Sequence, residues 1–505
     1  MVKLNWEGKI ECKNNINLLN YNKAYQCDLI ESIISPLNAN LEKDAYLKNL
    51  NAKREGIDNK RENIWKNKLF WGDNSIILNF LLKDFQEKIN LIYFDPPFGS
   101  GGDFDYIIQI GEGEAAKKAS KWLRKRSYSD SWKEGLNSYF NFMYKRLLLM
   151  RKLLSPKGSI YIHLDWHISH YIKIILDEIF GVDNFRNEII WAYPAASVQT
   201  RRFFMRSYDV ILFYSKSEDY VFNDDPNIYM EYSNRVKNAL KKDEKGVFYY
   251  RGGSHNGKKL SQKVYVKENG IFPRDVWKDI PYIRANTIEY QGFSTQKPER
   301  LLKRIILAST NENDLVADFF CGSGTTLIVA EKLGRRWIGC DRAKHAIHIT
   351  KKRLLDVFNS NNLLDWKDSY NKLALPFEIF KVSKVKNKSM LSEESPKFNI
   401  DIKKQDKIVI VELKDFIIPN QDNIPDNLRK KIMKWSDWVD YWAIDFDYKE
   451  NLFNMMWVSY RTPKNRELNL ISHSHKYEEG RNYIISIKAV DIFGNETMQK
   501  YTIEM

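Results

Sequence analysis

The chain has 505 residues, of which 43% are hydrophobic and 14% aromatic, so it can bury a substantial core and form several domains. Lys and Arg number 80 against 65 Asp and Glu, which gives a formal net charge of +15. This excess is expected of a protein that meets a polyanion, although a solvated basic surface gives the same count. No apolar stretch is long enough for a membrane span and no secretory signal opens the chain, so we expect a cytoplasmic protein with no membrane partner. The four cysteines lack CxxC spacing, which excludes a disulfide framework and a zinc site.

The N-terminal residues 1–65 are polar and rich in Asn and Lys, and runs such as LEKDAYLKNLNAKRE predict a helical extension. From Leu69 onward, short apolar runs end in Gly or Asp and precede helix-like segments. These runs are LFWGDN, INLIYFDPPFGS, GSIYIHLD, DVILFYS, DLVADFFCGSGTT and RRWIGCD. Their alternation with helices predicts an α/β fold with a doubly wound, mostly parallel sheet, whose ligands bind at the carboxyl ends of the strands.

The sheet domain is predicted to be interrupted once. Residues 191–293 have few periodic runs and many Lys, Arg, Tyr and Phe residues, which is typical of an insertion. The sheet domain would then comprise residues 66–190 and 294–375. A polar linker is expected over 376–400, followed by a β-rich domain over 401–505 whose aromatic run WSDWVDYWAIDFDY belongs to its core.

The strand INLIYF is followed by Asp95, Pro96, Pro97 and Phe98. An exocyclic aromatic amine is a poor nucleophile because its lone pair is delocalised into the ring. Asp95 can accept one amine hydrogen, and the carbonyl of Pro96, whose direction is fixed by the consecutive prolines, can accept the other. Phe98 can stack on a base swung out of a duplex. The tetrapeptide is therefore a candidate catalytic site.

The segment DLVADFFCGSGTTLIVAEKLGRRWIGCD predicts a strand, a Gly-rich turn, a helix and a second strand. Gly322 and Gly324 let the backbone approach a ligand closely, and Asp341 can hold ribose hydroxyls. The third glycine of the dinucleotide fingerprint is absent, so S-adenosylmethionine fits this turn better than a nicotinamide cofactor.

These motifs resemble the β-group of amino-methyltransferases of restriction-modification systems, in which a DPPY-like motif precedes an FxGxG-like motif with a target-recognition region between them. Similarity to type III modification (Mod) subunits extends through WGDN, FDPPF, SYSDSWKEGLNSYF, STQKPERLLKRIILAST and DFFCGSGTT, over roughly residues 69 to 355. The resemblance implies a Rossmann-like, S-adenosylmethionine-dependent fold with an inserted target-recognition domain. It implies transfer of a methyl group to the N6 amine of adenine in double-stranded DNA.

Site residues carry over from the family motifs position by position. Asp95, Pro96, Pro97 and Phe98 become the catalytic residues. The cofactor pocket is expected to include Asp318, Phe319, Phe320, Gly322, Gly324, Thr325, Asp341, Lys297, Thr295 and Asp73, with Gln296 a weaker candidate. Family members commonly carry Tyr or Trp where this chain has Phe98, which loses only a hydroxyl that stacking does not use. The cluster of His163, Asp165, His167 and His170 could suggest metal ligation, since histidines four apart can meet on a helix. However, GSIYIHLD reads as a strand and transfer from a sulfonium needs no metal, so no metal is expected.

Two regions are expected to contact DNA. One is the loop 99–132, whose basic side chains are Lys117, Lys118, Lys121, Arg124, Lys125 and Arg126. The other is the insertion, in which basic and aromatic residues interleave: Arg201, Arg202, Arg206, Lys258, Lys259 and Lys263 with Phe203, Phe204, Tyr208, Phe248, Tyr249, Tyr250 and Tyr265. A homodimer and a separate restriction (nuclease or helicase) subunit are the protein partners left open.

The sequence fits other methyltransferase activities less well. Covalent cytosine-C5 methylation requires a cysteine after proline, and none of the four cysteines follows one. Cytosine-N4 methylation is the main alternative because the same pocket chemistry serves either amine, although those enzymes usually begin the tetrapeptide with Ser. Methylation of RNA or of a protein amide, and a non-enzymatic DNA-binding module, remain as further alternatives.

Overall fold

The structure is a computed structural model of the chain, and its described residues are 2–14, 24–38, 65–99, 101–113, 121–130, 132, 135–193, 202–255, 258–266, 270–284, 287, 289–384, 396–419, 426–449, 452–478 and 480–505. The predicted helical run LEKDAYLKNLNAKRE, Lys117, Lys118 and Arg201 lie outside them. Within the described residues, no helix is both long and apolar enough to cross a membrane.

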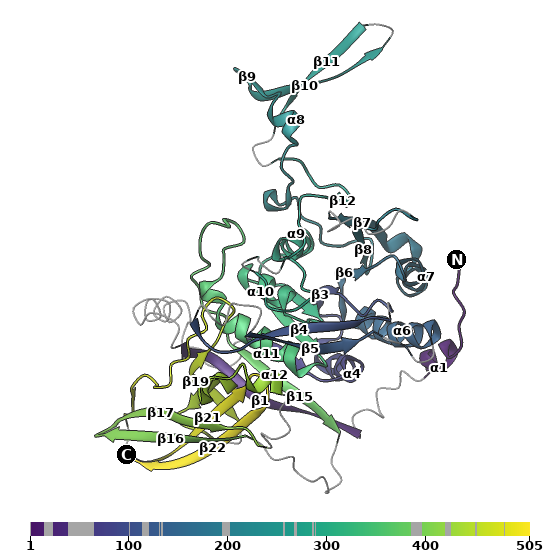
Figure 1. Ribbon diagram of the computed structural model, residues 1–505. Helices are drawn as coiled ribbons and strands as arrows, with labels where there is room; N and C mark the ends of the chain where they lie inside the picture. Colours follow the sequence, from purple (N-terminus) through teal and green to yellow (C-terminus); the bar gives the residue numbers. More distant parts are fainter. Residues whose placement is uncertain are drawn as a thin grey trace.

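A fourteen-stranded sheet runs through the described part of the molecule (Figure 1). In spatial order its strands are β12 (Val276–Trp277), β7 (Phe185–Ala192), β8 (Tyr208–Ser215), β6 (Leu154–Leu164), β3 (Ile89–Phe94), β13 (Leu315–Asp318), β14 (Arg336–Asp341), β2 (Asn67–Trp71), β15 (Phe377–Lys384), β1 (Tyr25–Asn38), β19 (Phe453–Tyr460), β18 (Val439–Asp445), β21 (Asn482–Asp491) and β22 (Glu496–Glu504). From β12 to β15 neighbouring strands pair in parallel, except that β8 is antiparallel to β7 and β6. The predicted doubly wound, mostly parallel sheet is confirmed.

Helices cover both faces of the parallel part of the sheet. One face carries α4 (Asn74–Phe85), α6 (Leu136–Leu153) and α7 (Ser169–Phe180), and the other carries α9 (Glu299–Ser309), α10 (Thr325–Lys332) and α11 (Lys344–Leu355). Side chains of β3 alternate between these layers, since Leu91 and Tyr93 join the α9 to α11 core whereas Ile92 and Phe94 join the α4 to α7 core. Burial on both faces explains why the strands are continuous apolar runs.

The direction of winding reverses between β3 and β13. The chain passes from β3 outward to β6, whereas it passes from β13 in the opposite direction to β14. The carboxyl ends of β3 and β13 therefore flank a crevice, which is the position where doubly wound sheets bind ligands.

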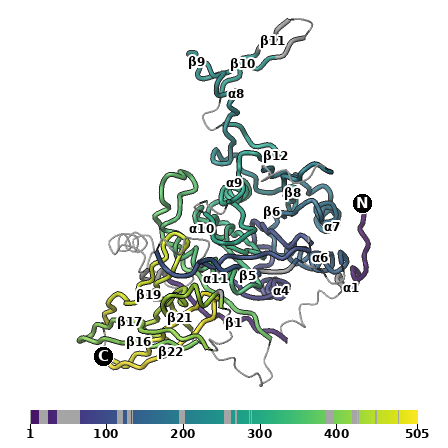
Figure 2. The backbone as a smooth tube through the Cα atoms, viewed as in Figure 1, coloured from purple at the N-terminus to yellow at the C-terminus, as the bar shows by residue number. Residues whose placement is uncertain are grey.

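The insertion begins later than predicted. β8 lies inside the sheet between β7 and β6, and β12 pairs with β7 at its edge, so residues 208–215 and 276–277 of the predicted insertion belong to the sheet. A projecting module lies between these two strands in the chain. It contains α8 (Asn234–Lys237) and a three-stranded sheet of β9 (Lys241–Asp243), β10 (Gly246–His255) and β11 (Lys258–Tyr265). This module projects from the body, as the ribbon and the tube both show (Figures 1 and 2). The central residues Val210, Ile211, Leu212 and Phe213 of β8 are buried in the sheet layers.

The N-terminal extension and the predicted linker also contribute strands. Residues 9–14 form the short helix α1 (Lys9–Asn14), but residues 25–38 form β1, which pairs with β15 and with β19. β15, inside the predicted linker 376–400, pairs in parallel with β2. The description of these segments as a helical extension and a linker is corrected accordingly: they join the sheet domain to the C-terminal strands.

The C-terminal region forms two packed sheets. β16 (Lys397–Gln405), β17 (Ile408–Ile417) and β20 (His475–Lys476) form one sheet, and β18, β19, β21 and β22 form the other, with the short helix α12 (Asp426–Arg429) beside them. Val411 of the first sheet and Trp442 and Ile487 of the second belong to a common buried core. A separate hairpin of β4 (Asp103–Gln109) and β5 (Trp122–Ser129) follows the catalytic tetrapeptide.

A buried ion cluster joins the N-terminal strand to both domains. The Glu31 carboxylate of β1 lies 2.9 Å from Lys351 Nζ of α11 and 3.3 Å from Lys488 Nζ of β21, and all three residues are buried. The charge of Glu31, with that of Glu496, keeps the pKa of Lys488 above its usual value although burial alone would lower it. The cluster therefore supports the junction only while the acid is present.

We expect Glu31→Ala to lower the free energy of unfolding by about 3 to 5 kcal/mol, because the buried Lys351 loses its counter-ion and Lys488 keeps only the more distant Glu496. Urea denaturation followed by tryptophan fluorescence measures this, with the exposed Glu504→Ala as the matched control. An unchanged unfolding midpoint for Glu31→Ala would show that the two lysines are solvated without it.

Candidate active site at the switch point of the sheet

A cavity of about 510 Å³ lies at the carboxyl ends of β3 and β13. Residues predicted for the two motifs line it together: Asp95, Pro97, Asp318, Phe319, Phe320, Gly322, Thr325, Asp341, Lys297, Thr295, Gln296 and Asp73. Pro96, Phe98 and Gly324 are not in its wall, and Pro96 is buried beneath it. Sequence reasoning missed further lining residues, namely Asn74, Tyr93, Trp132, Phe142, Arg146, Phe293, Leu302, Cys321, Ser323, Thr326, Arg342 and Ala343. Most of these residues lie within a motif or next to one in the sequence. Adjacency to a motif was therefore the signal that could have identified them.

Asp95 and Lys297 form an ion pair across the switch point. Lys297 Nζ lies 2.6 Å from Asp95 Oδ2, and both side chains are largely buried. The other oxygen, Asp95 Oδ1, is buried and accepts no hydrogen bond from the residues that the structure describes. A buried acceptor without a donor costs free energy, so this atom is prepared for a ligand that carries a hydrogen-bond donor.

The Phe98 ring packs on a histidine that is itself held by a chain of hydrogen bonds. It stacks at an interplanar angle of 17° on His163, whose Nδ1 lies 3.0 Å from Tyr93 Oη and whose Nε2 lies 2.9 Å from Asp209 Oδ2. Tyr193 Oη donates to the other Asp209 oxygen at 2.8 Å. Although burial opposes it, the hydrogen bond and charge of His163 lower the pKa of Asp209, so this acid stays ionised.

This network also accounts for the histidine that invited a metal hypothesis. Both ring nitrogens of His163 are engaged by protein groups, and His167 contacts Asp165 on the exposed side. Among the residues that the structure describes, no three His, Cys, Asp or Glu side chains are grouped for a metal ion.

The Gly-rich turn is fixed by two aspartates. Asp318 accepts hydrogen bonds from Phe320 N at 3.0 Å and from Thr326 Oγ1 at 2.5 Å. Asp341 accepts from Gly322 N at 2.9 Å and from Ala343 N at 2.8 Å. Each aspartate therefore shapes the turn as well as lining the cavity. Burial raises the pKa of Asp318 to about 7.

Gly324 starts α10 in the left-handed conformation with φ of 77°, which favours glycine. A Cβ at this position would lie 2.5 Å from Thr350 Oγ1. The close approach of α11 to the turn therefore depends on the absence of a side chain.

Asp73 connects the cavity to α6. It caps α4 by accepting from Ser75 N at 2.8 Å, and it lies 3.1 Å from Arg146 Nη2. Arg146 Nε donates to Asn74, which itself donates to the carbonyl of Phe319 at 2.8 Å. Although burial opposes it, Arg146 lowers the pKa of Asp73, which is held as a carboxylate at the wall.

The Gly-rich turn and the buried Asp95 carboxylate thus line one cavity at the carboxyl ends of neighbouring strands. A family model described as DNA methylase matches residues 89–352, more than half of the chain. The chain belongs to this DNA methylase family, and the resemblance noted in the sequence is confirmed.

Three curated relatives and one solved structure are similar to parts of the chain. The chain is 30% identical to the type II methyltransferase M.EcaI of Enterobacter cloacae, over 66% of this chain and 81% of that protein. It is 30% identical to the DNA adenine methyltransferase YhdJ of Escherichia coli, over 53% of this chain and 76% of that protein. The StyLTI Mod subunit of a type III restriction-modification enzyme of Salmonella typhimurium is 23% identical, over 64% of this chain and 60% of the subunit. The M1.HpyAVI-SAM complex superposes with a TM-score of 0.36 and 19% identity, covering 57% of this chain and 98% of that one.

We expect Gly324→Ala to distort the Gly-rich turn, because the added Cβ overlaps Thr350 and the residue has a positive φ. Binding of the cofactor should weaken by about tenfold or more, which isothermal titration calorimetry measures. Gly324→Ala with Thr350→Ala removes the nearest contact but not the backbone strain, so it should recover only part of the affinity. Wild-type affinity in Gly324→Ala would contradict the tight fit between α11 and the turn.

Proposed function

We propose that this protein is a site-specific DNA methyltransferase that transfers a methyl group from S-adenosylmethionine to the N6 amine of adenine in a flipped-out base. The observation that carries the proposal is the buried Asp95 Oδ1 beside the Gly-rich turn, an acceptor that receives no hydrogen bond within the described part of the chain. It lies at the switch point, where the cofactor turn and the amine acceptor share one cavity.

The cavity residues fit S-adenosylmethionine, which supplies an electrophilic methyl group on a sulfonium. Gly322 and Gly324 would let the turn approach the cofactor, and the cavity-lining acids Asp318 and Asp341 would interact with its cationic and hydroxyl groups. Asp341 already accepts two backbone hydrogen bonds, and a carboxylate has further lone pairs for ribose hydroxyls. Lys297 and Thr295 offer donors to a carboxylate, and Asp73 lies near Asn74 on the opposite wall.

Asp95, Pro96 and Phe98 act on the base. Asp95 Oδ1 and the carbonyl of Pro96 accept the two amine hydrogens, which makes the nitrogen more tetrahedral and more nucleophilic. Lys297 holds Asp95 Oδ2, so Oδ1 alone is directed to the amine. Phe98, supported from below by His163, stacks on the extruded base.

Adenine is favoured over cytosine as the substrate. Asp at the first position of the tetrapeptide is typical of adenine-specific members of the group, and YhdJ is named a DNA adenine methyltransferase. Cytosine-N4 methylation remains the second candidate because the same two acceptors serve its amine. The similarity to Mod subunits further supports a role in a restriction-modification system with a separate restriction subunit.

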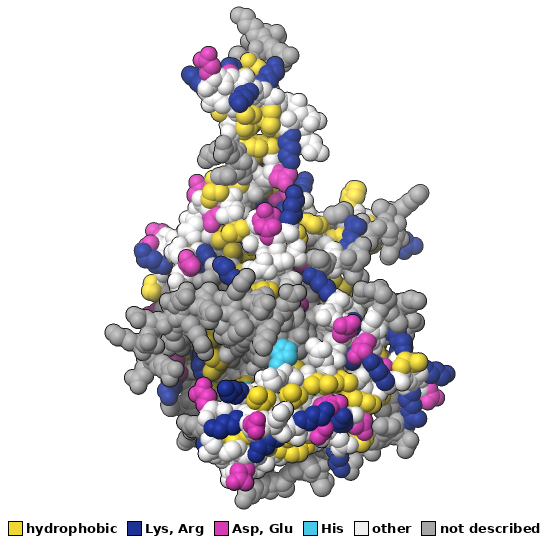
Figure 3. All heavy atoms as spheres, turned by 90° about the vertical axis from the view of Figure 1, so that its left-hand side faces the viewer, with side chains coloured by type: hydrophobic (Ala, Val, Ile, Leu, Met, Phe, Trp, Pro, Cys, Tyr) yellow, Lys and Arg dark blue, Asp and Glu magenta, His cyan; other side chains and the backbone are white. Residues whose placement is uncertain are grey.

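Exposed basic and aromatic side chains are available for DNA at the same edge of the sheet. Phe204 is 99% exposed, and Arg206 packs its guanidinium 3.6 Å from the centre of the Trp166 ring. The projecting module carries the exposed Tyr250 and Tyr265, and Figure 3 shows hydrophobic and basic side chains on this projection. We assign sequence recognition to this module, since it can reach along a duplex while the cavity engages one base.

We expect Asp95→Ala to abolish methyl transfer while leaving DNA affinity unchanged, because the variant removes an acceptor used at the chemical step. Long-read modification sequencing of DNA from cells expressing each form reports base, atom and recognition sequence together. Asp95→Asn keeps the size of the side chain and is the matched variant. A fully active Asp95→Ala protein would refute the mechanism, and N4-methylcytosine would refute the choice of base.

We expect binding of S-adenosylmethionine to strengthen as the pH rises from 6 to 8. Burial raises the pKa of Asp318 to about 7, and the charges of Asp95 and Asp341 add to this rise, so the acid is mostly protonated at pH 6. The cationic cofactor favours the ionised form, so its affinity should fall about tenfold between pH 8 and pH 6. Calorimetry in two buffers should detect a proton released at pH 7, and Asp318→Asn should remove both effects. A flat pH profile in the wild type would contradict this role of Asp318.

A further inference from the structure

The β4–β5 hairpin is attached at its base to the acceptor loop. The carboxylate of Asp130, which is 1% exposed, accepts hydrogen bonds from Phe98 N at 3.1 Å and from Gly99 N at 2.9 Å. The same carboxylate accepts from Trp132 Nε1 at 3.1 Å. The end of β5 therefore holds the backbone that immediately follows Pro97, and with it the ring that stacks on the base.

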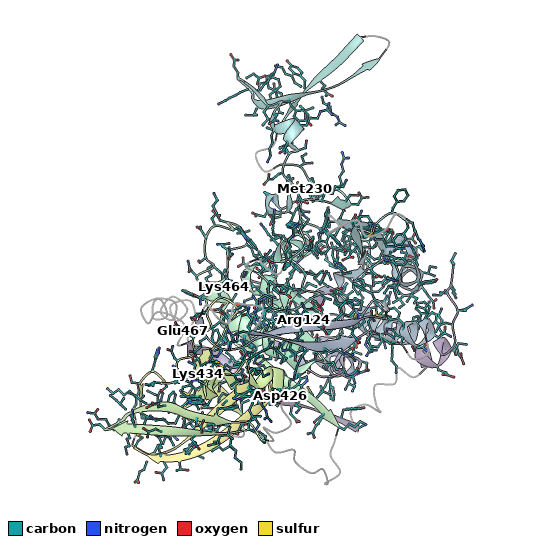
Figure 4. The ribbon with its side chains drawn as sticks, viewed as in Figure 1. Arg124, Met230, Asp426, Lys434, Lys464 and Glu467 are labelled. Carbon is teal, nitrogen blue, oxygen red and sulfur yellow. The ribbon has the colours of Figure 1, made fainter. Side chains whose placement is uncertain are left out.

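The hairpin is attached at its other end to the C-terminal domain. Arg461, whose side chain is 0% exposed, lies with Nη2 2.9 Å from Glu112 Oε1 and donates from Nη1 to the carbonyl of Gly111 at 3.3 Å. Arg466 Nη2 donates to the carbonyl of Gln109 at 2.6 Å. Lys434 pairs with the other oxygen of Glu112 (Figure 4 labels Lys434 here and Arg124 on β5). Buried charge of this kind is stabilising only while its partners stay in place.

Two lysines, one from each side of this contact, each donate a hydrogen bond to a backbone carbonyl of the other side. Lys121 Nζ at the start of β5 donates to the carbonyl of Lys431 at 2.5 Å, and Lys431 Nζ donates to the carbonyl of Trp122 at 2.6 Å. The hairpin also contacts the segment that precedes Lys297, since Ile107 N donates to the carbonyl of Gly292 at 2.8 Å. The C-terminal domain thus determines where one end of the hairpin lies, and the hairpin determines where the acceptor loop lies.

We propose that the C-terminal β domain is a positioning module of the acceptor site, acting through the β4–β5 hairpin, with Glu112, Lys431 and Asp130 as positioning residues. The proposal rests on the proposed methyl transfer for its kinetic consequence but not for its structural one. Glu112 and Lys431 do not line the cavity at the carboxyl ends of β3 and β13. Loss of the contact should therefore change the rate of transfer and not the affinity for the cofactor.

The test compares Glu112→Ala/Lys431→Ala with the control Glu412→Ala/Lys403→Ala. The control also removes one acid and one lysine, but both belong to an ion pair of the C-terminal domain away from the hairpin. At saturating cofactor and DNA, the hairpin variant should transfer at least about tenfold more slowly in a single turnover, since a displaced Phe98 loosens the base. Its cofactor dissociation constant should change less than about twofold. The control should transfer at the wild-type rate. Glu112→Gln, which keeps an acceptor for Arg461, should recover most of the rate.

Hydrogen exchange separates failure of this proposal from failure of the proposed function. In the hairpin variant, exchange should rise along residues 101–113 and 121–130 and extend to the amides of Phe98 and Gly99, whether or not the wild type methylates DNA. Faster exchange confined to the tip near Glu112 would overturn the proposal, as would a wild-type transfer rate. A parallel loss of rate, cofactor affinity and melting temperature would indicate general destabilisation and would also overturn it.

Discussion

The pair formed by Asp95 and Lys297 joins two parts of the chain that are 202 residues apart, and the site depends on it. Lys297 satisfies one carboxylate oxygen and leaves Oδ1 as a buried acceptor facing the cavity. Asp95 directly follows β3, and Lys297 lies just before α9, which packs against β3. This electrostatic contact between distant segments thus depends on the tertiary fold, and the orientation of the Asp95 carboxylate depends on that contact.

Several layers of the fold hold the residues that surround this pair. His163 and Asp209 hold the ring of Phe98 from the strands β6 and β8, and Asp130 holds the following backbone from the hairpin. On the cofactor side, Asp318 and Asp341 each accept backbone donors of the turn that they line. Residues that resemble ligand-binding groups in the sequence therefore also shape the backbone, and a substitution at them affects both roles.

The continuous sheet gives the additional domain a direct connection to the site. β1 and β15 carry the pairing from the methyltransferase strands to β19, and Glu31 joins this junction to α11. A domain attached by a flexible tether would transmit no positional restraint. Here strand pairing and buried ion pairs fix it, which is why its contacts with the hairpin can affect chemistry at Phe98.

The sequence by itself determined the doubly wound class, the order of the two motifs and about half of the residues that line the cavity. Those signals are local, since buried parallel strands are apolar runs and the catalytic and Gly-rich motifs are short and contiguous. Only the tertiary structure decided that β8 belongs to the sheet and that residues 25–38 and 377–384 form strands. It also decided that Asp130 binds the backbone of the acceptor loop and that Arg461 binds the far end of the hairpin. These features depend on which distant segments pair, and a strand or a buried charge shows its partner only once the chain has folded.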